Sequence, residues 1–267
     1  MKLRLPNEFL YQVFALIISI IIIHAIYVTN VRPRAADALS EQALAIQEDQ
    51  NYTVERSVWV LIRDFEQEAC FILMFWAFSI MGYKTARLLN EKNILRESLI
   101  PIKDGERILP EDTRQYSRII ESLPDQSKNM LLPRVLLSSL ERFGSTKNVQ
   151  DVSSVANTLC ESEGEKLESE LSMIRYIAWA IPSVGFIGTV RGIGEALGQA
   201  HRAVDGDIAG VTQSLGTAFN STFIALLISI VVMFLVHQLQ SLQERLIFDT
   251  QSYIDHKVIR HMHSQNN

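Results

Sequence analysis

Four apolar stretches dominate this sequence, and their length constrains the fold more than any other feature. A helix needs about 20 consecutive apolar residues to cross the hydrocarbon core of a bilayer. The stretches Phe9–Val28, Ile174–Leu197 and Leu215–Gln238 reach that length, and a shorter one centred on Ala69–Tyr83 approaches it. The sequence therefore predicts an all-α, polytopic membrane protein with four transmembrane helices.

Two of these stretches need a further argument. The second reaches a full span only if it continues to about residue 89, and Lys84 and Arg87 must then snorkel toward the headgroups. The first has the basic flank of a secretory signal in Lys2 and Arg4. Signal cores, however, contain only about 7–15 apolar residues, so an uncleaved anchor is expected.

Basic residues near the span ends predict the orientation, because they are retained on the cytoplasmic side. Several follow the second span, whereas the loop between the last two spans holds only Arg202. We therefore expect an inner-membrane protein of a bacterium with both termini in the cytoplasm. The expected division is a first transmembrane helix in 1–30, a periplasmic segment in 31–68, a second transmembrane helix in 69–89, a cytoplasmic helical domain in 90–173, the last two spans in 174–240 and a cytoplasmic C-terminal helix in 241–267.

Composition excludes several classes of function. The formal net charge of −5 gives no support for nucleic-acid binding. Cys70 and Cys160 lie far apart and without the spacing of metal ligands, so neither a zinc site nor a disulfide framework is expected. We expect no catalytic residues, no metal and no cofactor.

Long helices are expected to extend the last two spans into the cytoplasm. Leu159, Leu167, Leu171 and Ile174 recur at heptad-like spacing among acidic residues. This pattern predicts a helix that runs from the cytoplasm into the third span, and apolar residues beyond 238 predict the same for the fourth.

Small residues line one face of each of the last two spans. On a helix, residues 182, 185, 189, 192 and 196 share a face, and residues 218, 222, 225 and 229 share another. The first face consists of Pro182, Gly185, Thr189, Gly192 and Ala196, and the second of Ala218, Thr222, Ala225 and Ser229. Small residues allow close packing of membrane helices, for which Gly188 and Gly192 are suitably spaced. The alternative is that the two faces line a narrow polar path.

The depth of two threonines favours a polar path. Thr189 lies roughly 12 Å and Thr222 roughly 10 Å from the outer ends of their spans, at 1.5 Å per residue. Their hydroxyls can bind a carboxylate, water or cation, or instead their own i−4 carbonyl. The core of each span contains no Asp or Glu, and Arg191 and Glu195 lie near a span end. A carboxylate that carries protons would then have to come from a partner.

Residues 160–240 resemble the MotA/TolQ/ExbB proton channel family. The resemblance rests on the acidic helix Gly164–Leu171, the motif Pro182-x-x-Gly185-x-x-Gly188-Thr189-Val190-x-Gly192-Ile193, and Ala218-x-x-x-Thr222. The triplet Gly188-Thr189-Val190 is similar to TolQ and ExbB, whereas the additional N-terminal span is similar to MotA.

The resemblance implies a pentameric ring of this chain around a pair of single-span partner helices, similar to ExbD, TolR or MotB. An Asp on the partner carries the ion, and Thr189 and Thr222 face it. Ser221 and Asn220, next to Thr222, belong to the implied ion pathway. The implied packing and kink positions are Pro182, Gly185, Gly188, Gly192, Ala218 and Ala225.

Arg191 departs from the family pattern, because TolQ and ExbB proteins often have Trp there. It can pair with Glu195 at i+4, snorkel to the outer headgroups, or place a charge at the pore mouth. If it faced the pore, it would oppose the passage of cations.

The expected function is therefore the channel-forming subunit of a motor driven by H⁺ or Na⁺, which energises a partner in the cell envelope. A flagellar-stator-like or defence-system motor is an alternative within this class. A non-conducting membrane scaffold that uses its glycines only for oligomerisation is an alternative of another class.

Overall fold

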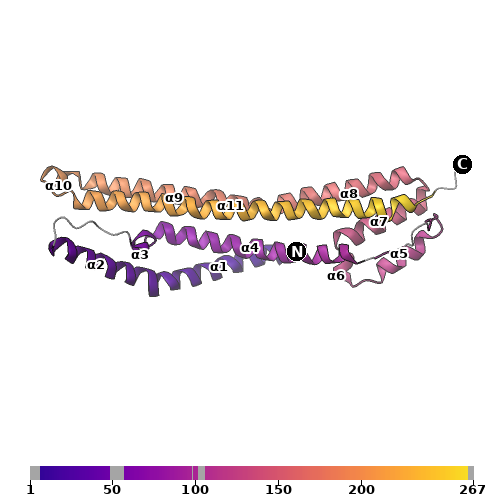
Figure 1. The fold of residues 1–267 in the computed structure, drawn as a ribbon, viewed down its shortest axis with the longest axis horizontal. Coiled ribbons are helices and arrows are strands. Elements are labelled where there is room, and N and C mark those ends of the chain that lie inside the picture. Colours follow the sequence, from indigo (N-terminus) through magenta and orange to yellow (C-terminus); the bar gives the residue numbers. More distant parts are fainter. Residues whose placement is uncertain (1–6, 49–56, 98, 102–105, 264–267) are drawn as a thin grey trace, which may run out of the picture. The chain divides into compact units, whose positions relative to one another are not determined.

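The computed structural model describes residues 7–48, 57–97, 99–101 and 106–263, and these residues form an all-α structure (Figure 1). Within them the only β-type pairing is an isolated bridge between Ile108 and Met262. The helices are α1 (Asn7–Ile26), α2 (Arg32–Glu48), α3 (Val58–Leu61), α4 (Phe65–Arg96), α5 (Thr113–Glu121), α6 (Asp125–Lys128), α7 (Leu131–Thr146), α8 (Val149–Glu170), α9 (Ser172–Gly198), α10 (Ala200–Val204) and α11 (Ala209–Lys257).

Four helical stretches are long and apolar enough to cross a membrane, as the sequence predicts. They are Glu8–Ala45, Phe65–Arg96, Val149–Gly198 and Ala209–His261. The predicted helical entrance to the third span is α8, and the single residue Leu171 separates its end from the start of α9. The extension of the fourth span is also confirmed, because α11 is one helix of 49 residues.

The first helix is longer than the predicted span. It continues from α1 through a π-helical turn, η1 (Tyr27–Val31), into α2, so that much of the segment assigned to 31–68 is helical. Apolarity marks only the first part of this helix. Polar and charged residues are interspersed with Ala and Leu in α2, and many of them, such as Gln and Glu, are good helix formers.

The chain divides into two compact units. The first, here called the apolar unit, comprises residues 1–82 and 173–236, and the second, the polar unit, comprises 83–172 and 237–267. Large apolar side chains cover the outside of the apolar unit, including Phe14, Ile21, Phe186, Ile230 and Phe234, each more than half exposed. An exterior of this kind suits lipid as the surrounding solvent.

The polar unit has its own apolar core. Fully buried residues from α5, α7 and α8, such as Ile120, Leu140 and Val152, pack in one cluster with Ile254 of α11. Because these helices bury apolar side chains against one another, this unit does not need lipid to cover them.

Lys84 corrects one sequence-based expectation. Its side chain is 4% exposed and its Nζ donates to Glu170 Oε2 at 2.9 Å, so it does not snorkel. The partner lies 86 residues away in the sequence, and local sequence therefore gave no sign of this ion pair.

Glu163 lies on α8, outside the apolar stretch of α9, and is nearly buried. Burial disfavours its charged form, but hydrogen bonds from Lys166 at 2.8 Å and Arg134 at 3.0 Å outweigh that effect. Together they hold the pKa of Glu163 below its usual value.

Candidate functional site

The helices α9 and α11 approach each other closely along their faces of small residues. A Cβ added at Gly192 would lie 2.7 Å from Ala218 Cβ and 2.8 Å from the carbonyl oxygen of Ser214. Non-bonded carbon atoms need about 3.5–4.0 Å, so a glycine is required here. Gly185 meets Ala225 and Gly188 meets Ser221 in the same way, which shows that the two helices are antiparallel.

Thr189 and Thr222 lie at the edge of this contact, and their hydroxyl groups are hydrogen-bonded to each other. Thr189 Oγ1 also lies 3.2 Å from the carbonyl oxygen of Ala218, and Thr222 Oγ1 lies 3.1 Å from that of Gly185. Each hydroxyl has only one proton, so it cannot donate to all its acceptors at once. The pair can therefore exchange hydrogen-bond partners without any movement of the helices.

The two other residues assigned to the ion pathway have different surroundings. Ser221 is fully buried, and its hydroxyl donates to the carbonyl of Thr217 at 3.1 Å. Its side chain faces Gly188, which places it in the helix contact. Asn220 is half-buried. Among the hydrogen bonds of the described residues, none joins Ser221 or Asn220 to the threonine pair.

Pro182 has a direct structural consequence for α11. Proline has no N–H group, so the carbonyl of Ala178, four residues earlier, loses its usual helical donor. Ser229 of α11 donates to this oxygen at 3.3 Å. In a membrane no water replaces this missing hydrogen bond. Ser229, which belongs to the small-residue face of α11, therefore supplies the donor that α9 lacks at Pro182. In the sequence, the proline itself indicates that the carbonyl of Ala178 needs a hydrogen-bond donor from another helix.

Arg191 forms a three-residue ion-pair cluster. It pairs with Glu195 at 2.7 Å, as its i+4 spacing predicts, and also makes two bonds to Glu66 at the start of α4, at 2.7 and 2.8 Å. Two residues along a helix correspond to about 200°, so Arg191 and Thr189 lie on nearly opposite faces of α9. The guanidinium group thus ties α9 to α4 and does not face the threonine pair.

Glu66, in the first turn of α4, lies close to α9 as well as to Arg191. Its Cγ would lie 3.0 Å from a Cβ at Gly188, in the middle of α9. The sequence places Glu66 before the second apolar stretch, and its contact with α9 crosses more than 100 residues. That contact is not visible in the sequence.

A second polar cluster, absent from the sequence-based site, joins the first helix to α4. Glu68 is nearly buried and binds Arg32 at 2.6 Å and His24 at 2.7 Å. Nearby, Tyr27 Oη and Gln67 Oε1 are buried without a hydrogen-bond partner. Among the described residues, no group of His, Cys, Asp and Glu has the arrangement of a metal site.

One comparison with known proteins covers the region of the threonine pair. A search of curated protein sequences gave no match. The model of the MotA/TolQ/ExbB proton channel family matches residues 127–252, just under half of the chain, and this range contains α9 and both threonines. Through this region the chain is similar to the MotA/TolQ/ExbB proton channel family, and its four helical stretches that are long and apolar enough to cross a membrane are those of a multi-pass membrane protein.

Proposed function

We propose that this chain is the channel-forming subunit of an ion-driven motor of the bacterial inner membrane, with both termini in the cytoplasm. The observation that supports this proposal most is the hydroxyl pair of Thr189 and Thr222. Two antiparallel helices that carry the family match bring these groups together at similar depth. We propose no enzymatic reaction for the chain.

In the proposed mechanism, copies of the chain form a ring, a pentamer, around a single-span partner. An Asp on the partner helix takes up a proton near the threonine pair, and its neutral form can then cross the apolar wall between copies. The hydroxyls act as donors to the charged carboxylate and as acceptors for the protonated one. Release of the proton toward the cytoplasm then lets the ring advance by one copy.

The direct test replaces Thr222 by Val in the complex purified with its single-span partner and reconstituted in vesicles. The shape of the side chain is kept and the hydroxyl is lost, so proton uptake driven by a membrane potential should fall at least tenfold. Thr222→Ser should retain most of the flux. Thr212→Val is the matched control, because this α11 hydroxyl donates to the carbonyl of Ile208, four residues earlier, and not to α9. Unchanged flux in Thr222→Val would remove the threonine pair from the pathway.

A non-conducting scaffold is the second candidate, and one observation favours it. The carbonyl groups of Gly185 and Ala218 already accept from the two threonines, as expected if the hydroxyls serve only helix packing. For a scaffold, the wild-type complex should take up no protons, and Thr222→Val should change only the stability of the assembly. Flux in the wild type that depends on the Thr222 hydroxyl excludes this candidate.

A further inference from the structure

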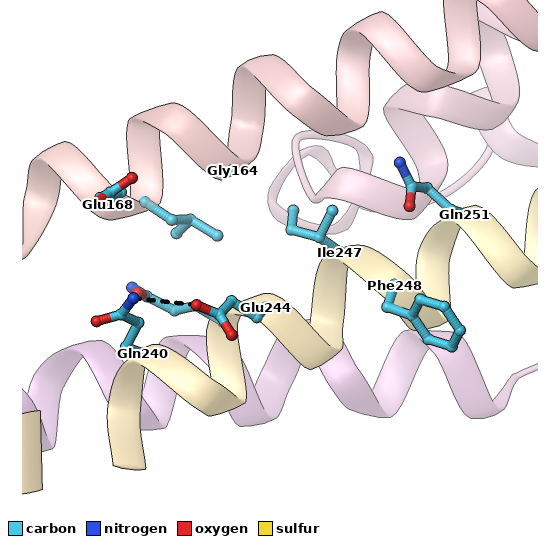
Figure 2. A pocket seen from close by; sticks show the side chains of 9 residues that line it. Gly164, Glu168, Gln240, Glu244, Ile247, Phe248 and Gln251 are labelled. Atoms are coloured by element: carbon cyan, nitrogen blue, oxygen red, sulfur yellow. Dashed lines mark hydrogen bonds between the residues drawn. The ribbon is translucent and has the colours of Figure 1, made fainter. Parts of the chain in front are cut away.

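The polar unit contains a pocket of about 300 Å³ between α8 and α11, beside Gly164. Figure 2 shows Glu168 and Glu244 toward one end of it and Phe248 toward the other. The described residues of this unit do not indicate which molecule fills the pocket. The last two spans of the apolar unit, in contrast, carry an apolar surface whose position indicates what covers it.

Each of the last two spans has an apolar stripe beside its threonine. The stripe of α9 consists of Trp179, Phe186 and Val190, and the stripe of α11 consists of Phe219, Phe223 and Ile230, each more than half exposed. Because successive residues turn by about 100°, every member lies about 60–100° around its helix from Thr189 or Thr222. The small residues that join α9 to α11 lie on the other side of each threonine. The two stripes therefore border the threonine pair on its two outer sides.

Helix α4 covers the opposite side of α9. Cys70 of α4 donates to the carbonyl oxygen of Ile181 at 3.6 Å. The Cγ of Glu66 would lie 3.0 Å from a Cβ at Gly188. Residues 181 and 188 lie about 80–100° from Thr189 in the direction away from the stripe. The threonine pair and the stripes thus share the face that α4 leaves open, and lipid suits this face poorly because hydrocarbon cannot hydrogen-bond to the hydroxyls.

We propose that the stripe of α9 in one copy packs against the stripe of α11 in the next copy of the ring. The inference rests on the proposed function, because it requires a closed ring. The two stripes differ, so the contact is head-to-tail, which is the type of interface that can close a ring. Rotation about the ring axis keeps every residue at the same height in all copies.

The heights of the two stripes match along their length. Within one copy, the contacts of Gly185 with Ala225 and of Gly192 with Ala218 define which residues of α9 and α11 are level. By this register three pairs are level, each within about one residue or 1.5 Å: Val190 with Phe219, Phe186 with Phe223, and Trp179 with Ile230. Apolar side chains of one copy therefore meet apolar side chains of the next at every level of the contact.

This contact supplies the apolar wall that the proposed mechanism requires. Val190 directly follows Thr189, and Phe223 directly follows Thr222. Each junction between copies therefore places apolar side chains between one threonine pair and the next. Such a junction disfavours a charged carboxylate of the single-span partner and admits its neutral form. The second copy thus completes the site.

Oxidative cross-linking of the full chain, together with its single-span partner in membranes, tests this contact. Val190→Cys with Phe219→Cys places two thiols level on facing stripes, and Phe186→Cys with Phe223→Cys is an independent second pair. With iodine, which enters the bilayer, both pairs should give a ladder from dimer up to the full ring. The native cysteines are buried, and the wild-type chain is the control for them.

Matched variants test the face and the height separately. Ile187 is about as exposed as Phe186 but lies about 100° around α9 from it, so Ile187→Cys with Phe223→Cys should give at least tenfold less product. Val190→Cys with Ile230→Cys, about 15 Å apart in height, should give none. Equal yields from the Ile187 and Phe186 pairs, or dimers from Phe219→Cys alone, would overturn the proposal.

Failure of this inference can be separated from failure of the proposed function. If both stripe pairs give no ladder while the complex remains a ring that takes up protons, lipid or another surface covers the stripes and the inference is wrong. If the wild-type complex forms no ring and no flux is measured, the proposed function fails as well. Mass measurement of the intact complex and the flux assay supply these two readings.

Discussion

Replacing Gly192 by Ala tests whether close contact between α9 and α11 sets the stability of the apolar unit. The new Cβ would lie 2.7 Å from Ala218 Cβ, 2.8 Å from the Ser214 carbonyl oxygen and 2.9 Å from the Ala218 nitrogen. Because two of these atoms belong to the backbone, no rotamer change relieves the contact. The helices must separate locally by about 1 Å to reach normal carbon–carbon distances.

The cost can be worked out from two opposing effects. Overpacking costs about 1–3 kcal/mol, and replacing a helical glycine by alanine returns up to about 1 kcal/mol. Gly192→Ala should therefore destabilise the unit by about 1 kcal/mol, within a range of roughly 0–2 kcal/mol. Gly194→Ala is the matched control, since a Cβ there meets no atom within 4 Å. Gly194→Ala should therefore only gain the higher helix propensity of alanine, which stabilises the unit by up to about 1 kcal/mol.

Reversible unfolding in mixed micelles, titrated with a denaturing detergent, measures this difference. The two variants should differ by about 2 kcal/mol, which corresponds to roughly a 30-fold ratio of unfolding constants. Both substitutions add one methyl group to the same helix two residues apart, so general effects of hydrophobicity cancel. Equal stability of the two variants would refute the argument that helix contact, and not glycine content, matters here.

Three further predictions follow from other contacts. Ser229→Ala removes the donor to the Ala178 carbonyl and should destabilise the apolar unit by about 1 kcal/mol in the same titration, while Ser229→Thr should not. Arg191→Met leaves the Glu66 carboxylate without its cation and should destabilise the apolar unit by about 1–3 kcal/mol in the same titration, and adding Glu66→Gln should recover part of that loss. Because the pKa of Glu163 is lowered in the fold, this group contributes stability above its unfolded pKa, and that stability is lost as the pH falls through the lower, folded value. Glu163→Gln should therefore flatten the acidic limb of a stability–pH profile, and an unchanged limb would contradict this assignment.

The sequence predicted the parts of this structure that follow from periodicity. Apolar length gave the four spans, and the spacing of Gly185, Thr189 and Gly192 gave the face of α9 that meets α11. Antiparallel connection then brought Thr189 to the level of Thr222. These features depend on local sequence and on one short connection, so no knowledge of distant contacts was needed.

Contacts between distant segments could not be predicted. Glu66 lies 125 residues from Arg191, and Lys84 lies 86 residues from Glu170. In the sequence, Lys84 and Glu66 are charges that flank an apolar stretch, where solvation is the default expectation. Their ion-pair partners are Arg191 of α9 and Glu170 of α8, which lie beside α4 only in the folded structure. The pocket beside Gly164 was likewise invisible, because it depends on how two helices diverge.

The π-helical turn at Tyr27–Val31 has a consequence for the register of the first helix. A π-turn accommodates one residue more than an α-helical turn, so every side chain after it is rotated by about 100° relative to an uninterrupted α-helix. Downstream of the turn, Arg32 binds Glu68 and Arg34 stacks on the ring of Trp59 at 4.6 Å. Deleting a single residue within the turn would restore regular winding and point both arginines in another direction. The irregular turn thus sets the direction in which the side chains of α2 point, and the contacts of Arg32 and Arg34 with Glu68 and Trp59 depend on that direction.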